Sequence, residues 1–558
     1  MATTIPILGT WGGLGATTVY DPKKGRYTIT TNATTRFGKM TAGLLEEADA
    51  TGIASGYRVI KKDRVSSSGT EYSVICTTNG TGTKMYHKTA AASSWTDFTP
   101  AAGTPQTDFG ANVATDMVVL FSDFLDKDAV IVGFGTTKEW YYSEGVGTTW
   151  VKNGLAAERS EFMTKAYIQE TGLATARMIY AVSPAASLTM TGTEVYTVTD
   201  VNGTPTGKTT IAPGLSDYVT SIAENDLGDI FIGTRNKLYS FDENGLPVVV
   251  AGPFADPPTD AGGQSDRRNF EAYVQLPDSS MLYVVEGYSI IRVRSAADPI
   301  TERMPDVGPR SRVDVEGGIP RLELPVSAIA RAGDWVICAL TADTSKFTLA
   351  NQPGGTTLLQ NTLTNAVSEL YVGKLVNGEL VWWGSELTCT DRLRYMWYEA
   401  ANNYLYLCSG DSESVNVQQK RCYFFLTDPY GRLISSAIKL SAGTPIIEFP
   451  PFDIGGEYEP KGGGLITIDA QSLTSTTTCT VAIRPQPDYD TSSTFTTLAV
   501  FSSAAVAERG VHVGRSVTFD KLRVKVTLGA GSGTAFPRFN GGTVTLHPLR
   551  ERQSVGAI

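Results

Sequence analysis

The feature that most constrains the fold of this chain is a weak internal repeat with a spacing of roughly 45 to 65 residues. Each copy has a polar turn rich in Gly, Asp or Asn, then an apolar strand, then a second strand that carries aromatic residues. Five copies follow Asp126, Gly228, Pro277, Gly333 and Asn402. Runs such as Ile230-Phe231-Ile232 suit an inner strand that is buried on both faces. This spacing predicts that each copy is one blade of a β-propeller.

Two less regular units, at residues 56 to 110 and 161 to 215, extend the series. The sequence therefore predicts an all-β protein with a β-propeller of about seven blades, with six or eight as the alternatives. Composition agrees, since charged residues are only 19% of the chain and 56 residues are glycine. Such a composition favours many short strands joined by tight turns.

The predicted domain boundaries follow changes in composition. Residues 1–54 have too little apolar periodicity for a core, with one strand at 27–30 and a short helical patch at 40–50, so they form an arm that docks elsewhere or completes the first blade. Residues 55–445 form the propeller. Several prolines and the run Gly462-Gly463-Gly464 indicate a linker or crossover. Alternating strands near residue 521 then predict a C-terminal β-sandwich with a short tail over 446–558.

Charge and residue spacing exclude several classes of site. The net charge is −10 and no dense Lys/Arg run occurs, so we expect no specific nucleic acid partner. No segment has the roughly 18 apolar residues that suggest a membrane span. The six cysteines lack metal or redox spacing and are expected to be buried thiols. The three histidines, which are dispersed along the predicted domains, make a shared metal site or catalytic triad implausible; they are His87, His512 and His547.

One local motif is more specific than the internal repeat. The stretch YYSEGVGTTW, residues 141–150, resembles the Asp-box turn of sialidases and other BNR-repeat propellers, with Ser143, Gly147 and Trp150 in matching positions and Gly145 in place of the aspartate. A more degenerate copy, YHKTAAASSW, places Trp95 in the matching position. The Asp-box is a structural turn between outer strands of a blade, so the resemblance implies architecture and not activity.

No catalytic residue, metal ligand or cofactor site is predicted, and we expect the chain not to be an enzyme. The only Arg-x-Pro sequence, at Arg303-Met304-Pro305, follows both degenerate boxes, whereas the resemblance to sialidases requires it before them. The acidic residues Asp123, Asp126 and Asp128 have a spacing that could suit calcium, but a solvated turn is the favoured interpretation. Aromatic groups such as Trp382-Trp383 are interpreted as core, with a sugar platform as the alternative.

The C-terminal stretch FDKLRVKVTLGAGSGTAFPRFNGGTVTLHPL, residues 519–549, resembles a recurrent ending of bacteriophage tail proteins. In that ending a strand of alternating basic and apolar residues leads through a Gly/Ser/Thr turn to a Pro-containing turn and a last strand. With the predicted propeller, the chain is similar to a bacteriophage minor tail or virion structural protein. It departs from the usual pattern at Thr543-Val544-Thr545-Leu546, where a more basic or aromatic segment is usual.

The resemblance implies a structural tail component of the minor tail, tail-tip or nozzle type that contacts other tail proteins as a symmetric homo-oligomer. The amino terminus MATTIPILGTWGG has neither the basic nor the apolar region of a secretion signal, so we expect assembly in the host cytoplasm and a final location in the virion tail. Two alternatives remain open. One is a tail protein that binds host surface glycans, and the other is a glycosidase with a BNR-like propeller.

Overall fold

The fold was analysed in a computed structural model of the chain. It describes residues 3–7, 23, 26–27, 29–31, 33–49, 52–134, 140–153, 162–170, 173–182, 193–198, 200–202, 206–211, 219–241, 247–255, 269–286, 289–294, 301–303, 326–341, 368–389, 393–409, 419–425, 444–453, 461–474, 476–486, 495–502, 508–529 and 537–548.

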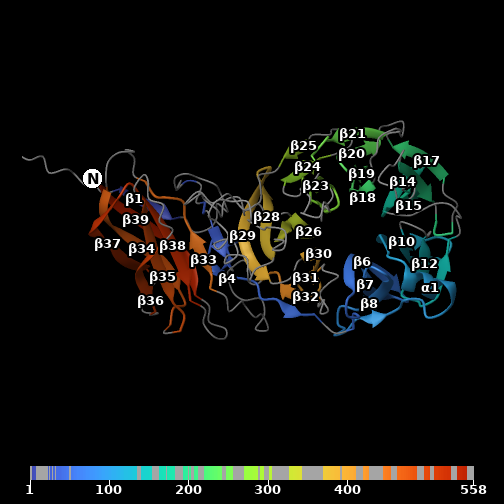
Figure 1. The fold of residues 1–558 in the computed structure, drawn as a ribbon, viewed down its shortest axis with the longest axis horizontal. Helices are drawn as coiled ribbons and strands as arrows, with labels where there is room; N and C mark the ends of the chain where they lie inside the picture. Colours follow the sequence, from blue (N-terminus) through green and yellow to red (C-terminus); the bar gives the residue numbers. More distant parts are fainter. Residues whose placement is uncertain are drawn as a thin grey trace, which may run out of the picture.

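The larger part of the molecule is a ring of four-stranded antiparallel sheets (Figure 1). The first three sheets are β6 (Arg58–Ser67), β7 (Thr70–Thr78), β8 (Thr83–Lys88) and β9 (Thr96–Asp97); β10 (Asp116–Ser122), β11 (Lys127–Gly133), β12 (Tyr141–Glu144) and β13 (Trp150–Lys152); and β14 (Phe162–Glu170), β15 (Leu173–Val182), β16 (Thr193–Val198) and β17 (Thr206–Ile211). The only helix among the described residues, α1 (Gly103–Ala111), connects the first sheet to the second.

The next three sheets repeat the order. They are β18 (Val219–Glu224), β19 (Ile230–Thr234), β20 (Leu238–Phe241) and β21 (Pro247–Ala251); β22 (Tyr273–Gln275), β23 (Met281–Val285), β24 (Ser289–Val293) and β25 (Thr301–Arg303); and β26 (Val326–Ala332), β27 (Trp335–Thr341), β28 (Ser368–Val376) and β29 (Glu379–Cys389).

The seventh sheet closes the ring with a strand from the start of the chain. It contains β30 (Leu393–Glu399), β31 (Tyr404–Ser409) and β32 (Lys420–Tyr423), and its fourth strand is β5 (Glu47–Ala48). First strands of neighbouring sheets contact one another, as β6 does with β10 and β30, so they surround the central channel. The prediction of an all-β fold with a propeller of about seven blades is confirmed.

Apolar residues fill the spaces between neighbouring sheets. Val74, Cys76 and Met117 belong to a buried cluster between the first and second sheets, and Ile75 with Tyr406 belongs to the cluster between the first and the seventh. Side chains alternate along a strand, so a strand that is apolar at every position serves two interfaces. The run Ile230-Phe231-Ile232 is such a strand and lies in β19, the second strand from the channel.

The second unit is a sandwich of two antiparallel sheets, at the left of Figure 1. One sheet has the order β1 (Thr3–Ile7), β39 (Arg538–Pro548), β34 (Lys461–Gln471) and β37 (Glu508–Phe519). The other has the order β2 (Ile29–Thr31), β33 (Ile446–Glu448), β38 (Lys521–Leu528), β35 (Cys479–Gln486) and β36 (Thr496–Phe501). Leu522, Val524, Val526 and Leu528 of β38 point into its core, as the alternation predicts.

The N-terminal segment belongs to both units. Strands β1 and β2 extend the two sheets of the sandwich, while β5 completes the seventh sheet of the propeller. The predicted helical patch at 40–50 is wrong, because this segment contains β4 (Thr41–Ala42), which pairs with β3 (Ala33–Thr34), and β5. The glycine run at 462–464 is also not a linker, since it lies inside β34. Its glycines let strands approach closely: a Cβ on Gly464 would lie 2.4 Å from the carbonyl oxygen of Thr545.

A buried ion pair fastens the β3–β4 hairpin, which packs on the core of the sandwich, to the sixth sheet. The Nε atom of Arg36 lies 2.7 Å from Oε1 of Glu386 in β29, and both side chains are fully buried. The guanidinium of Arg36 also donates to the carbonyl of Phe424 and stacks on the ring of that residue. Trp335 and Trp383 of the sixth sheet pack against the core of the sandwich. The propeller and the sandwich therefore share packed side chains.

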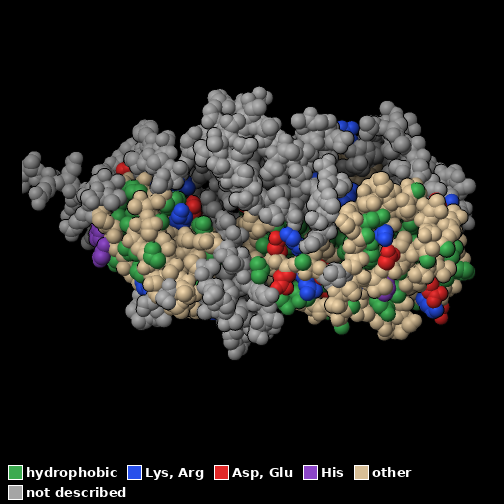
Figure 2. All heavy atoms as spheres, turned by 60° about the horizontal axis from the view of Figure 1, so that its bottom comes forward, with side chains coloured by type: hydrophobic (Ala, Val, Ile, Leu, Met, Phe, Trp, Pro, Cys, Tyr) green, Lys and Arg blue, Asp and Glu red, His purple; other side chains and the backbone are tan. Residues whose placement is uncertain are grey.

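The described surface mixes charges of both signs. Figure 2 shows Lys and Arg side chains beside Asp and Glu side chains on the face it presents, without a broad basic area among the coloured residues. None of the helices in the described ranges is both long and apolar enough to cross a membrane.

Candidate functional site

The turn motif lies between the outer two strands of the second sheet. The hydroxyl of Ser143 donates to the carbonyl of Gly147 at 2.7 Å, and Ser143 pairs across the hairpin with Trp150. The indole N–H of Trp150 donates to the carbonyl of Phe98, which directly follows β9 of the first sheet, 3.0 Å away. The three residues therefore lie together, and the tryptophan contacts the neighbouring blade.

The replacement of the Asp-box aspartate by glycine has a steric explanation. Gly145 has φ +53°, a conformation that residues with a side chain rarely adopt. A Cβ at this position would lie 2.5 Å from the hydroxyl oxygen of Ser67, the last residue of β6. The close approach of two blades leaves no room for a side chain at this position.

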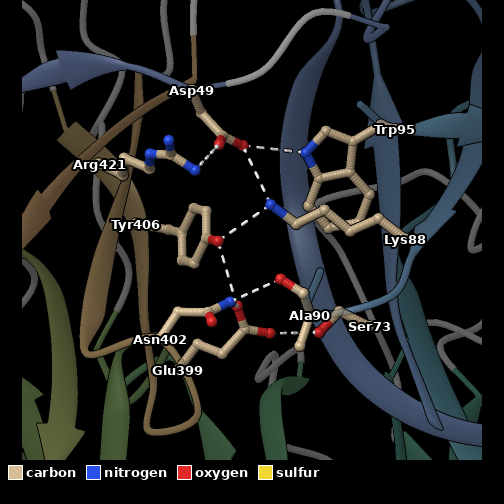
Figure 3. Close-up of polar contacts among 9 residues, drawn as sticks. All are labelled: Asp49, Ser73, Lys88, Ala90, Trp95, Glu399, Asn402, Tyr406 and Arg421. Atoms are coloured by element: carbon tan, nitrogen blue, oxygen red, sulfur yellow. Dashed lines mark hydrogen bonds and ion pairs between the residues drawn. The ribbon is translucent and has the colours of Figure 1, made fainter. Parts of the chain in front are cut away.

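The degenerate copy at 86–95 occupies the corresponding hairpin of the first sheet, between β8 and β9. There Lys88 stands where the first motif has Ser143, and Trp95 stands where it has Trp150. Both side chains turn toward the seventh sheet. They join a buried group of polar residues that we call the closure cluster: Asp49, Ser73, Lys88, Trp95, Glu399, Asn402, Tyr406 and Arg421 (Figure 3).

Asp49 is the centre of one half of the closure cluster. Its Oδ2 atom accepts from the indole N–H of Trp95 at 3.0 Å and lies 3.5 Å from the ammonium of Lys88. Its Oδ1 atom lies 3.2 Å from Nη1 of Arg421 in β32. The backbone N–H of Asp49 donates to the carbonyl of Gln419. One side chain that directly follows β5 thus binds residues of the first and seventh sheets.

Glu399 is the centre of the other half. Oε1 accepts from the hydroxyl of Ser73 at 2.7 Å, and Oε2 accepts from the hydroxyl of Tyr406 at 3.1 Å and from Asn402 at 3.4 Å. Lys88 connects the halves, because its ammonium donates to the hydroxyl of Tyr406 at 2.9 Å (Figure 3). The ammonium also lies over the rings of Trp95 and Tyr406, at 4.6 and 4.5 Å from their centroids.

The closure cluster balances its charges, with two carboxylates and two cations. Burial lowers the pKa of Lys88, although Asp49 and Glu399 oppose this effect. Burial also raises the pKa of Tyr406, and Glu399 adds to that shift. Each carboxylate oxygen of Asp49 and Glu399 already accepts from a donor in the cluster. The geometry therefore suits a structural connection between the first and seventh sheets. Sequence reasoning missed this cluster because its members are separated by up to 372 residues and share no motif.

A second polar group lies in the central channel. The ammonium of Lys61 in β6 lies 3.3 Å from Oδ1 of Asp116 in β10, and the Lys61 side chain is 29% exposed. Asp116, Tyr273 and Tyr395 raise the pKa of Lys61 against the effect of burial. These residues belong to the first strands of the second, fifth and seventh sheets.

The remaining candidates stay apart. His87 lies in β8, while His512 and His547 lie in the sandwich. Asp126 occupies a turn with φ +53°, and Asp128 accepts from the backbone N–H of Ser66. Trp382 and Trp383 are buried in two different cores. All six cysteines are free and buried. Within the described ranges, no three His, Cys, Asp or Glu residues are placed to hold a metal ion. Met304 and Pro305 lie outside the described residues.

Comparisons with known proteins concern the architecture. No family model and no curated protein matches the chain. Among solved structures, a chain of the mitotic checkpoint complex is 11% identical, with a TM-score of 0.38, and the match covers 69% of this chain and 95% of that one. Puromycin hydrolase is 10% identical, with a TM-score of 0.39, and the match covers 71% of this chain and 60% of the hydrolase. Oligogalacturonate lyase in complex with manganese is 9% identical, with a TM-score of 0.37 and coverage of 68% and 98%.

The prediction that the chain is not an enzyme is contradicted by these structures. Puromycin hydrolase and oligogalacturonate lyase are enzymes on propeller folds, so a propeller does not argue against catalysis. The error came from inferring a lack of activity from the lack of a familiar motif, although one fold carries many different sites. At these identities the likeness concerns the fold alone.

Proposed function

We propose that the chain is a structural component of a bacteriophage tail, of the minor tail, tail-tip or nozzle type, and that it acts through assembly contacts. The observation that carries this proposal is that β1 and β2 belong to the two sheets of the sandwich while β5 completes the seventh sheet of the propeller. The N-terminal strands thereby tie the propeller to the sandwich, as a subunit that transmits position within a particle requires.

The C-terminal resemblance supports the same function. Its two strands, β38 and β39, lie in different sheets of the sandwich, so the stretch that resembles phage tail endings contributes to both faces of this unit. Within the proposal, the partners are other tail proteins and further copies of the chain in a symmetric ring. The location is the virion tail, after assembly in the host cytoplasm.

The test is to purify the phage particles whose genome encodes this chain and to count its copies by quantitative mass spectrometry. We expect a fixed number per particle that matches a ring seen by electron microscopy. Arg36→Met, which breaks the ion pair with Glu386, should reduce incorporation, whereas Lys127→Met, at an exposed position of the second sheet, should not. Absence of the chain from complete particles would refute the proposal.

A further inference from the structure

The innermost strand of the first sheet is strongly basic in an acidic chain. Strand β6 has the sequence RVIKKDRVSS, with four cationic residues and one acidic residue, while the whole chain has a net charge of −10. Its N–H and C=O edge faces the central channel, because β6 contacts the first strands of the second and seventh sheets. Cations on this strand therefore lie close to the central channel.

The cations of β6 divide between its two faces. Lys61 pairs across the sheet with Cys76, which packs toward the second sheet, and its ammonium binds Asp116 there. Lys62 pairs with Ile75, whose side chain packs toward the seventh sheet. Arg64 pairs with Ser73, which binds Glu399 on that same side. Residues opposite each other in a sheet share a face, so Lys62 and Arg64 both point toward the seventh sheet.

The nearby carboxylates already bind other donors. Both oxygens of Glu399 accept from residues of the closure cluster. The oxygens of Asp63 accept from the backbone N–H groups of Arg64 and Val119, at 2.8 and 3.0 Å. Among the described residues, no carboxylate forms an ion pair with the side chain of Lys62 or of Arg64. Two cations of like sign thus stand two residues apart on one face, about 7 Å between their Cα atoms.

We propose that Lys62 and Arg64 form a binding site for a small oxyanion, the carboxylate of an acidic sugar or a phosphate group, on the face of β6 that points toward the seventh sheet. Arginine presents a fork of N–H donors that suits both kinds of oxyanion, and lysine adds a point charge beside it. Lys62 is partly buried and Arg64 is exposed, so a ligand reaches the guanidinium of Arg64 first and the ammonium of Lys62 second.

The titration of Lys62 fits this site. Burial and then the charge of Arg64 lower the pKa of Lys62 to about 8, although Asp63 and Glu399 oppose them. A bound anion supplies the missing opposite charge and raises this pKa again. Binding should therefore be accompanied by proton uptake near pH 8. The affinity should fall about tenfold between pH 7 and pH 9, as Lys62 loses its proton in the free protein.

The experiment is isothermal titration calorimetry of the full chain with inorganic phosphate and, separately, with glucuronate, at low ionic strength and at pH 7 and pH 9. We expect saturable binding of at least one probe. Phosphate alone would identify a phosphoryl ligand, and glucuronate alone an acidic sugar. Lys62→Met should weaken binding at least tenfold at pH 7, equivalent to about 1.4 kcal/mol. Lys62→Arg should keep the affinity but lose the difference between pH 7 and pH 9.

The matched control is Lys127→Met, which removes an exposed lysine that pairs with Glu144 away from the channel and should leave binding unchanged. Thermal unfolding midpoints would show that each variant is folded. If neither probe binds the natural protein, or if Lys62→Met binds as well as the natural protein does, the site does not exist. Equal weakening by Lys127→Met would show only general charge attraction and would also overturn the proposal.

Discussion

The sharpest prediction concerns the charge of Asp49. Its side chain is fully buried, and it neutralises Lys88, whose side chain is only 2% exposed. Asp49→Asn keeps the size of the side chain and an oxygen that can accept from Trp95, so it removes the charge and little else. Arg421 is 26% exposed and can be solvated when the charge is lost. The loss of stability therefore comes mainly from Lys88, which stays buried without an opposite charge.

Breaking one side of a buried ion pair destabilises proteins by about 3 to 5 kcal/mol. Lys88 keeps the hydroxyl of Tyr406 and two aromatic rings, so we expect the lower end, about 3 kcal/mol. Urea unfolding followed by tryptophan fluorescence measures this loss. The closing strand should open first, seen as faster hydrogen exchange of the Asp49 amide that binds Gln419.

Two further variants separate charge from packing. Asp49→Asn with Lys88→Met removes both charges and should recover at least half of the lost stability, because no unpaired ion remains. Glu144→Gln, in an exposed pair with Lys127, should cost less than about 0.5 kcal/mol. The reasoning fails if Asp49→Asn costs less than about 1 kcal/mol, or if the double variant is no more stable than Asp49→Asn.

Three other predictions follow from single contacts. Arg36→Met leaves the buried Glu386 unpaired and should cost about 3 kcal/mol in urea unfolding, and adding Glu386→Leu should restore part of it; no restoration would argue against a charge effect. His87 is half-buried between the rings of Tyr72 and Phe98, and this partial burial lowers its pKa, so the unfolded chain binds the proton more readily; stability should fall as pH drops below about 6.5, and His87→Phe should flatten this loss. Gly145→Ala should lower the thermal unfolding midpoint clearly, since its Cβ would meet Ser67, and Ser67→Gly should relieve part of that effect.

The strands of the propeller could be predicted, but its closure could not. The run Ile230-Phe231-Ile232 predicts a strand because every position is apolar, and the polar turn before it marks where the strand begins. Strand β5 has two residues, Glu47 and Ala48, and neither apolar periodicity nor a turn signal distinguishes it. Its place depends on Asp49 meeting Lys88 and Arg421, contacts that exist only in the closed ring. Local sequence patterns carry no information on such distant pairs.

The long sequence separation between the closing strand and its partners also affects how the ring forms. Asp49 is made early, yet its partner Arg421 follows 372 residues later. Bringing distant segments together costs chain entropy before the contacts form, so the closing strand should be among the last to dock. Until then Lys88 and Trp95 lack the carboxylate that they bind in the closed ring. A buried, charge-balanced cluster at this seam would then be formed only when both ends of the propeller are present, which favours the complete ring over partly closed forms.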